Sequence, residues 1–494
     1  METTPVILSD ITTTISGVIG DFDQSSVLWA LIVGIILAFL LGNGMGANDV
    51  SNAFGTSVGS GVLTMVQAYI LASIFEALGS ILVGWSVADT MRKGVVDTSQ
   101  YADDPKELLL GQVAILGGCA AWLLIATVLH MPVSTTHSLV GATIGFSIVL
   151  RGLEGIQWMT IVRIVCSWFL SPILSGIISS IIYMIVDHTV LRTGDPLKNG
   201  LRALPVFYFV CMAFNALVVF WDGSKLLHFN EIPAWGIAAI VIGVGCVAAA
   251  LAHFVLKPRI KSNIKGSKVQ STPSRFSDVE SANDSEKLKG LPEQKLQNVQ
   301  QRKTPSGKIR KFYVWLLPDR TRVDGRNITK LFSTIQVFTA CFAGFAHGAN
   351  DVSNAIAPLA AIISIYRTKS VEQTESVPIY VLLYGVFAIC VGLWLFGHYV
   401  IKTVGTNMSE INPASGFTIE FGAAMTSLLA SKVGLPLSTT HCLVGSVVAV
   451  GMIRSENGVK WSIFRDIAIS WVVTLPVSGL ISAGIMFVIK WAVL

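Results

Sequence analysis

Long apolar stretches recur along the chain and alternate with short polar connections. Each reaches or approaches the roughly 20 residues that a helix needs to cross a bilayer. They predict spans at 26–43, 66–88, 108–129, 133–151, 157–187, 203–221, 234–256, 331–346, 379–403, 416–433, 437–453 and 461–490. We therefore expect an all-α polytopic membrane protein with about twelve transmembrane helices, seven before a central polar segment and five after it.

Composition favours this class over a soluble one. Hydrophobic residues make up 52% of the chain and charged residues only 13%, whereas a soluble protein averages roughly 25% charged residues. Residues 1–25 contain no Lys or Arg, so they do not resemble a secretory signal peptide. The seven cysteines all lie in apolar segments and have no disulfide or metal-ligand spacing.

The central segment, residues 257–330, has the opposite character. It holds 18 Lys and Arg against 7 Asp and Glu, and it is rich in Ser and Gln. This composition predicts a largely disordered loop. Basic loops remain on the cytoplasmic side of membranes, which we favour over nucleic-acid binding. Seven spans before the loop and five after it then place both termini, including the tail 1–25, outside the cell.

Three motifs occur twice at one offset. Gly46–Ala53 recurs as Gly348–Ala355, and Met131–His137 recurs with conservative changes as Leu435–His441. A Ser-Trp pair followed by Pro and Ser-Gly also occurs twice. The offsets of 302 to 304 residues indicate a duplicated unit rather than chance.

Parity gives the relation between the two copies. We assign 26–187 to the first copy and 331–494 to the second, with connecting helices in 203–256. Their first spans are seven spans apart, an odd number, so the copies cross the membrane in opposite senses. This predicts an inverted repeat with its site near the bilayer midplane. The glycine-rich sequence after Asn43 favours re-entrant or broken helices over an additional full span.

Asp49 and Asp351 lie beside long apolar runs. A carboxylate at mid-membrane costs about 2.5–3.5 kcal/mol on insertion scales, which implies a compensating partner. Neither motif contains Lys or Arg, so a bound cation such as sodium is the natural candidate, with Asn52 and Asn354 adding oxygen ligands. The alternative is that Asn-Asp only caps a helix N-terminus.

Each Ser-Thr-Thr-His peptide follows a proline that fits the start of a helix. First-turn hydroxyls and free backbone N–H groups at the positive end of a helix dipole suit a small oxyanion. Two such turns entering from opposite sides could grip one tetrahedral anion, while ordinary capping is the alternative. The residues concerned are Ser134, Thr135, Thr136, Ser438, Thr439 and Thr440.

Five further polar residues in apolar surroundings are candidates for transport. His137 and His441 could relay protons or only form hydrogen bonds. A serine nucleophile paired with either histidine is disfavoured, because no third orienting group is evident and a duplicated active site is unusual for hydrolases. Glu76, Glu420 and Gln112 lie within predicted spans, where gating or helix–helix hydrogen bonding competes with ligand contact.

Both Gly-Ala-Asn-Asp-Val-Ser-Asn peptides and both Ser-Thr-Thr-His peptides resemble those of the inorganic phosphate transporter family, the sodium– or proton–phosphate symporters. The resemblance covers nearly the whole chain except the tail and the central loop. It implies inorganic phosphate as substrate, a homodimer, and transport roles for Asp49, Asp351, Glu76, Glu420 and the Ser-Thr-Thr residues. We group Asn48 and Asn350 with the phosphate ligands. The chain departs at Gln112, where animal members typically have glutamate.

Together these features predict a secondary active symporter, not an enzyme, that imports phosphate by alternating access in the plasma membrane. Moving one negative charge into a cell at −100 mV costs about 2.3 kcal/mol, so cations must accompany the anion. Sodium is the expected coupling ion and no other metal or cofactor is expected. A proton-coupled phosphate symporter or a sulfate symporter is the alternative, with an anion channel and a membrane phosphatase as rivals.

Overall fold

The computed structural model describes residues 22–84, 96–221, 223, 228–269, 308–320, 322, 324–373, 375, 377–402, 408–432, 437–454 and 458–494. Every regular element within these ranges is helical. Within the same ranges, extended residues pair only in two isolated bridges, Val96 with Ile156 and Ser409 with Val459. The all-α expectation is therefore confirmed for the part of the chain that the structure describes.

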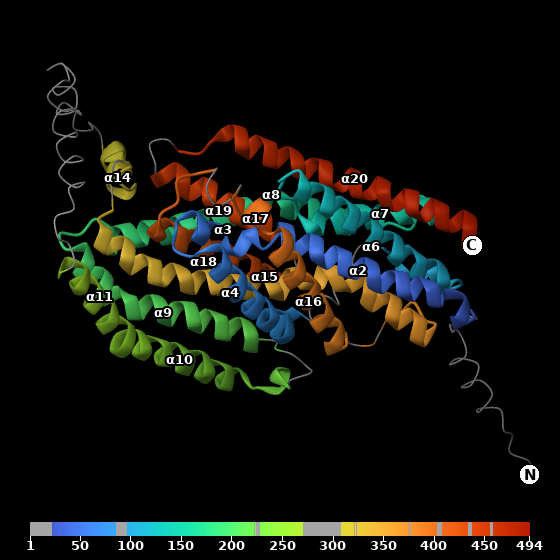
Figure 1. Cartoon of the computed structure of the whole chain (residues 1–494), viewed down its shortest axis with the longest axis horizontal. Coiled ribbons are helices and arrows are strands. Elements are labelled where there is room, and N and C mark those ends of the chain that lie inside the picture. The colour runs from blue at the N-terminus through green and yellow to red at the C-terminus, as the bar shows by residue number, and fades with distance from the viewer. Residues whose placement is uncertain are drawn as a thin grey trace, which may run out of the picture.

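Long helices run side by side along the molecule (Figure 1). The first half contains α2 (Leu28–Asn48), α3 (Ser51–Gly59), α4 (Met65–Gly79), α6 (Pro105–Val128), α7 (Thr135–Arg151) and α8 (Trp158–Val186). The middle contains α9 (Pro196–Phe220), α10 (Ala234–Leu251), α11 (Lys257–Val269) and α14 (Lys308–Leu316). The second half contains α15 (Arg326–Thr368), α16 (Ile379–Phe396), α17 (His398–Lys402), α18 (Pro413–Lys432), α19 (Thr439–Arg454) and α20 (Trp461–Val493).

Short 3-10 and π turns complete the described helices. They are η1 (Gln24–Val27), η2 (Ser80–Gly84), η3 (Thr98–Tyr101), η4 (Asp187–Leu191), η5 (Phe229–Glu231) and η6 (Ala252–Leu256). Three of them, η2, η4 and η6, continue α4, α8 and α10 as π turns. These extensions lengthen the corresponding membrane-spanning candidates.

Within the described residues, nine helical segments are long and apolar enough to cross a membrane. The three expected spans outside this set are α7, α18 and α19, of which α19 qualifies only as a shorter apolar helix. Each of the three carries polar residues that the sequence marks as candidates, such as Thr135, Glu420 and Thr440. These side chains are buried inside the protein rather than facing lipid.

Helices of the two halves are packed against each other in a reciprocal pattern. α7 packs on α20 and α19 on α8, while α2 packs on α16 and α15 on α4. Motif glycines permit the last two crossings. A Cβ atom at Gly46 would overlap the carbonyl oxygen of Ile389, and one at Gly348 would overlap that of Glu76. Larger residues at these glycines would push the helices apart.

The two Asn-Asp motifs differ in backbone structure. In the first copy the helix breaks between Asn48 and Ser51 and turns at Gly61, as expected. In the second copy α15 continues for 43 residues through the motif, so the expectation of a broken helix there is wrong. An alanine-rich apolar sequence follows the second motif in place of glycines, and Pro358 is accommodated within the helix.

Helices occupy both described ends of the basic segment 257–330, namely α11 and α14, and α15 begins at Arg326. Residues 270–307 and most of the tail 1–25 lie outside the described residues. The seven cysteines are all free, in agreement with the expectation of no disulfide framework.

Candidate functional site

The Ser-Thr-Thr-His peptides start helices, as the sequence predicts. Ser134 precedes α7, and its hydroxyl accepts a hydrogen bond from the backbone N–H of His137 at 3.5 Å. Ser438 does the same for α19, accepting from the N–H of His441 at 3.3 Å. Both serines are N-caps, which leaves the threonine side chains free to face other elements.

Each motif aspartate contacts the first threonine of the helix start in its own copy. Thr135 donates a hydrogen bond to Asp49, and Thr439 donates to Asp351 at 2.7 Å. Both carboxylates are almost fully buried. Because each threonine hydroxyl donates its proton to a carboxylate, its lone pairs remain available to a cation.

The motif asparagines instead reach across to the opposite copy. Asn52 donates to the hydroxyl of Thr440 at 2.8 Å, and Asn354 donates to that of Thr136 at 3.3 Å. Asn354 also donates to Asp351 at 3.1 Å. The structure therefore joins the four duplicated peptides into one buried cluster containing side chains from both halves.

Asn48 and Asn350 serve the local backbone. The Asn48 amide donates to the carbonyl of Met131 at 2.9 Å, and its oxygen accepts from the N–H of Val133 at 3.0 Å. Asn350 donates to the carbonyl of Ala346 one turn earlier in α15. Asn48 thus holds the loop before α7 against the end of α2, and its side-chain oxygen is already engaged.

Glu420 accepts hydrogen bonds from two elements, α3 and α15. Thr56 and Ser57 of α3 both donate to Oε1 at 2.5 Å, and Gln336 donates to the same oxygen at 3.3 Å. Thr339 donates to Oε2 at 2.7 Å. The carboxylate is fully buried, and these donors stabilise its charged form.

Glu76 belongs to a different group, which contains a histidine that sequence reasoning missed. His347 lies directly before the second motif, where the first copy has Met45. Its Nδ1 lies 3.3 Å from Glu76, and its Nε2 lies 3.3 Å from Asp351. The sequence does contain a sign of this histidine, because a titratable residue, His347, precedes one copy of the motif where an apolar residue, Met45, precedes the other.

Several polar atoms in this cluster have no hydrogen-bond partner among the described residues. They are Asp49 Oδ1, Asn52 Oδ1, Asn354 Oδ1, both carboxylate oxygens of Glu76 and both ring nitrogens of His347. Five of these atoms are oxygens, and buried oxygens without donors are the ligands that a cation such as sodium requires. The chemistry of these residues therefore fits a bound cation better than a second anion.

A small cavity lies within the cluster. Its volume is about 20 Å³, enough for one water-sized occupant, which needs roughly 10–15 Å³ by this measure. It is lined by Asn52, Ala343, Ala346, His347, Glu420, Ala423, Ala424, Ser427 and Thr439. Both halves and both kinds of motif thus contribute to one buried space.

The two motif histidines meet where the halves join. The rings of His137 and His441 are 4.5 Å apart and nearly perpendicular. Each also lies on a tryptophan of its own copy, at 3.6 Å from Trp168 and 3.7 Å from Trp471. Each Nδ1 faces the tryptophan carbonyl of the opposite copy, so these rings fasten the two helix starts together.

Gln112 is not brought into the cluster. It lies in α6, next to Gly111, which packs on Phe146. Thr127 of the same helix contacts Asn48 at 3.2 Å. Fifteen residues separate Gln112 from Thr127, which corresponds to about 22 Å along an α-helix. Its role in transport remains a prediction.

The phosphate transporter family model matches residues 45–482 of this chain. Sodium-dependent phosphate transporter 1 of Rattus norvegicus is 34% identical, over 94% of this chain and 96% of its own length. Sodium-dependent phosphate transporter 1-A of Danio rerio is also 34% identical, over 96% of each chain. A solved structure described as the sodium-dependent phosphate transporter superposes with a TM-score of 0.76 at 30% identity, covering 94% of this chain and all of that one. The chain therefore belongs to the phosphate transporter family.

Proposed function

We propose that this protein is a symporter that carries inorganic phosphate across a membrane together with sodium ions. The observation that carries the proposal is the duplicated Asp–Thr pair: Thr135 donates to Asp49, and Thr439 donates to Asp351. Each pair places a buried carboxylate beside a helix start. A group that suits a cation, the carboxylate, is therefore next to a group that suits an anion, the helix start, as coupling between the two ions requires.

The phosphate site is proposed at the first turns of α7 and α19. The two turns are close, since Thr440 donates to the carbonyl of Val133 at 3.2 Å and the histidine rings meet. Free N–H groups at a helix N-terminus bind oxyanions without an arginine. Because Thr135 and Thr439 donate to carboxylates, we assign these two hydroxyls to the cation sites and not to the phosphate site. The backbone N–H groups of both turns and the Thr136 hydroxyl remain for the anion, because the Thr440 hydroxyl already donates its proton to Val133.

The sodium sites are proposed at two equivalent places. One combines Asp49, Asn52 and Thr135, and the other combines Asp351, Asn354 and Thr439. The unpartnered Asp49 Oδ1, Asn52 Oδ1 and Asn354 Oδ1 atoms supply ligands in both. Two sodium ions accompanying one phosphate monoanion carry net positive charge inward, which a negative membrane potential favours.

We further propose an inverted repeat of about twelve spans that works by alternating access. The exchange of helices between halves, α7 on α20 and α19 on α8, supports a twofold relation between the copies. We also propose that the central loop is cytoplasmic, that both termini lie outside, and that the protein is a homodimer in the plasma membrane. We propose no enzymatic activity for it.

Uptake of labelled phosphate into proteoliposomes tests the function. Replacing external sodium by choline should abolish uptake at both pH 6 and pH 8. Uptake that persists in choline at the lower pH would favour the proton-coupled alternative, and uptake indifferent to either gradient would favour a channel.

Two further measurements sharpen the assignment. Unlabelled sulfate should compete poorly with labelled phosphate, and strong competition would favour the sulfate alternative. The ratio of labelled sodium to labelled phosphate taken up should approach two. A ratio of one would contradict the two-site assignment without affecting sodium coupling itself.

A further inference from the structure

α14 exposes a full helical turn of apolar and aromatic side chains. Phe312, Tyr313, Val314 and Trp315 are between 53% and 60% exposed. Four consecutive residues cover slightly more than one turn, so apolar groups point in several directions around the helix, and on one side the Trp315 ring lies 5.0 Å from His188. Figure 1 shows α14 apart from the bundle of long helices. A continuous exposed apolar patch of this kind marks an interaction surface.

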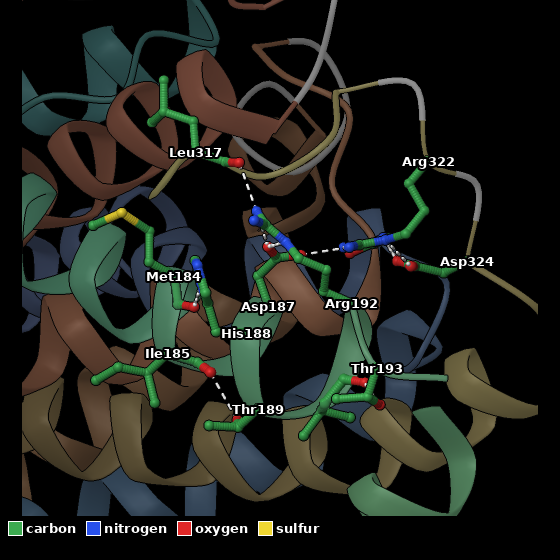
Figure 2. Close-up of polar contacts among 12 residues, drawn as sticks. Met184, Ile185, Asp187, His188, Thr189, Arg192, Thr193, Leu317, Arg322 and Asp324 are labelled. Atoms are coloured by element: carbon green, nitrogen blue, oxygen red, sulfur yellow. Dashed lines mark hydrogen bonds and ion pairs between the residues drawn. The ribbon is translucent and has the colours of Figure 1, made fainter. Parts of the chain in front are cut away.

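Hydrogen bonds hold the C-terminal end of α14 in place, and Figure 2 shows the one from Arg192 to Leu317, directly after the helix. The guanidinium of Arg192 donates to the carbonyl of Trp315 at 2.5 Å and to that of Leu317 at 2.6 Å. The ring of His188 lies 3.1 Å from the same Trp315 oxygen. Arg192 directly follows the membrane-spanning candidate Trp158–Leu191. The aromatic turn is therefore fixed beside the end of this candidate span.

A buried carboxylate organises these contacts. Asp187 is fully buried and pairs with Arg192 at 2.7 Å and with Arg322, which also contacts Asp324 at 3.2 Å. We name Asp187, Arg192 and Arg322 the Asp187 clamp. Burial by itself would lower the pKa of Arg322, but the hydrogen bond to Asp187 and neighbouring negative groups raise it. The guanidinium therefore stays charged, as a buried ion pair requires.

The Asp187 clamp also reaches the helices that carry the candidate site. Asp324 accepts a hydrogen bond from Asn412 at 2.5 Å. Asp324 lies just before α15, which carries Asp351, and Asn412 lies just before α18, which carries Glu420. The position of α14 is thus coupled through short polar contacts to the first turns of α15 and α18.

The sequence of α14 is basic at its N-terminal end. Its first four residues include Lys308, Arg310 and Lys311. Aromatic side chains concentrate at the level of lipid headgroups, and basic residues beside a membrane attract anionic lipids. We propose that α14 docks in the headgroup region of the leaflet it faces and binds anionic phospholipids there.

Hydrogen–deuterium exchange of the full-length protein in nanodiscs tests this proposal. The probe is phosphatidylserine, and discs of phosphatidylcholine alone are compared with discs that also contain phosphatidylserine. Amide exchange in 308–317 should slow at least about tenfold in the anionic discs, because each basic residue near an anionic surface strengthens binding.

Two variants test whether the basic residues of α14 cause this protection. The double variant Arg310→Gln/Lys311→Gln should lose most of the added protection while keeping the wild-type melting temperature. Arg465→Gln, which removes an exposed arginine from α20, should keep it. Equal exchange of the wild-type protein in both kinds of disc would overturn the proposal. So would protection that follows protein concentration rather than lipid charge, since a second copy would then cover α14.

Discussion

The two Asn-Asp motifs are nearly identical in sequence but lie on different backbones. In the first, α2 ends at Asn48 and α3 begins at Ser51. In the second, α15 runs through the motif without interruption. Both nevertheless place an aspartate against the first threonine of a helix start. The polar contacts therefore depend on where the side chains meet and do not require the same helix geometry.

The copies also differ in ionisable groups. His347 stands between Glu76 and Asp351 in the second copy, while Met45 fills the matching position in the first. Glu420 has four hydrogen-bond donors, whereas Glu76 accepts no hydrogen bond among the described residues and faces His347 Nδ1 at 3.3 Å. We infer that the cation sites are duplicated, whereas the handling of a proton or of a further charge belongs to the group of His347, Glu76 and Asp351, which contains residues of both halves.

The largest expected effect concerns the shared aspartates. Asp49→Asn and Asp351→Asn should each reduce sodium-driven phosphate uptake about a hundredfold or more, because a neutral amide no longer compensates the charge of a bound cation. The measurement is uptake in proteoliposomes, with yield and gel-filtration profile as controls for folding. Wild-type uptake in either variant would refute the cation assignment, and a large effect in only one would show that the copies are not equivalent.

A smaller effect is expected where the copies differ. His347→Met gives the second copy the residue of the first, and should lower uptake about tenfold, because Glu76 and Asp351 then share a buried region without the imidazole. His347→Gln, which keeps a polar group but cannot be protonated, should fail to restore uptake. Uptake should be compared from pH 6 to pH 8. If both variants take up phosphate at the wild-type rate at every pH in this range, the imidazole has no part in transport.

The threonines test whether the Asp–Thr pairs are equivalent. Thr135→Val and Thr439→Val should each raise the sodium concentration for half-maximal uptake about tenfold, since a hydrogen bond to a charged group contributes roughly 1.5–3 kcal/mol. Serine at either position keeps the hydroxyl and should restore most of the affinity. A change confined to phosphate affinity would instead assign these hydroxyls to the anion.

The smallest effect concerns the turn that follows α3 in the first copy. Gly61 has a φ of 72°, a conformation that costs another residue about 1–2 kcal/mol. Gly61→Ala should lower the melting temperature slightly, although no neighbouring atom would contact the added methyl group. Gly484→Ala in α20 is the matched control, because it also meets no neighbour but has ordinary helical φ, and it should be neutral or stabilising. Equal shifts would show that φ strain at Gly61 is not the cause.

Much of the candidate site follows from sequence pattern. Proline before Ser-Thr-Thr-His predicts the helix start that Ser134 and Ser438 cap. A carboxylate within an apolar run predicts a buried functional group, and Glu420 is fully buried. The continuous α15 was not predictable from the motif itself, because Asn and Asp are compatible with both a break and a helix. The residues that follow the motif differ between the copies, and they determine whether the helix breaks or continues.

The sequence by itself determined the membrane class, the duplication, the helix starts and the types of residue that line the site, because these depend on local composition and spacing. Only the tertiary structure decided which copy each side chain contacts. Asn52 reaches Thr440 and Asn354 reaches Thr136 across the halves, and His347 joins the carboxylates because α15 crosses α4 closely at Gly348. Such contacts arise from packing between segments 218 to 388 residues apart, and no local sequence pattern predicts which distant segments will meet.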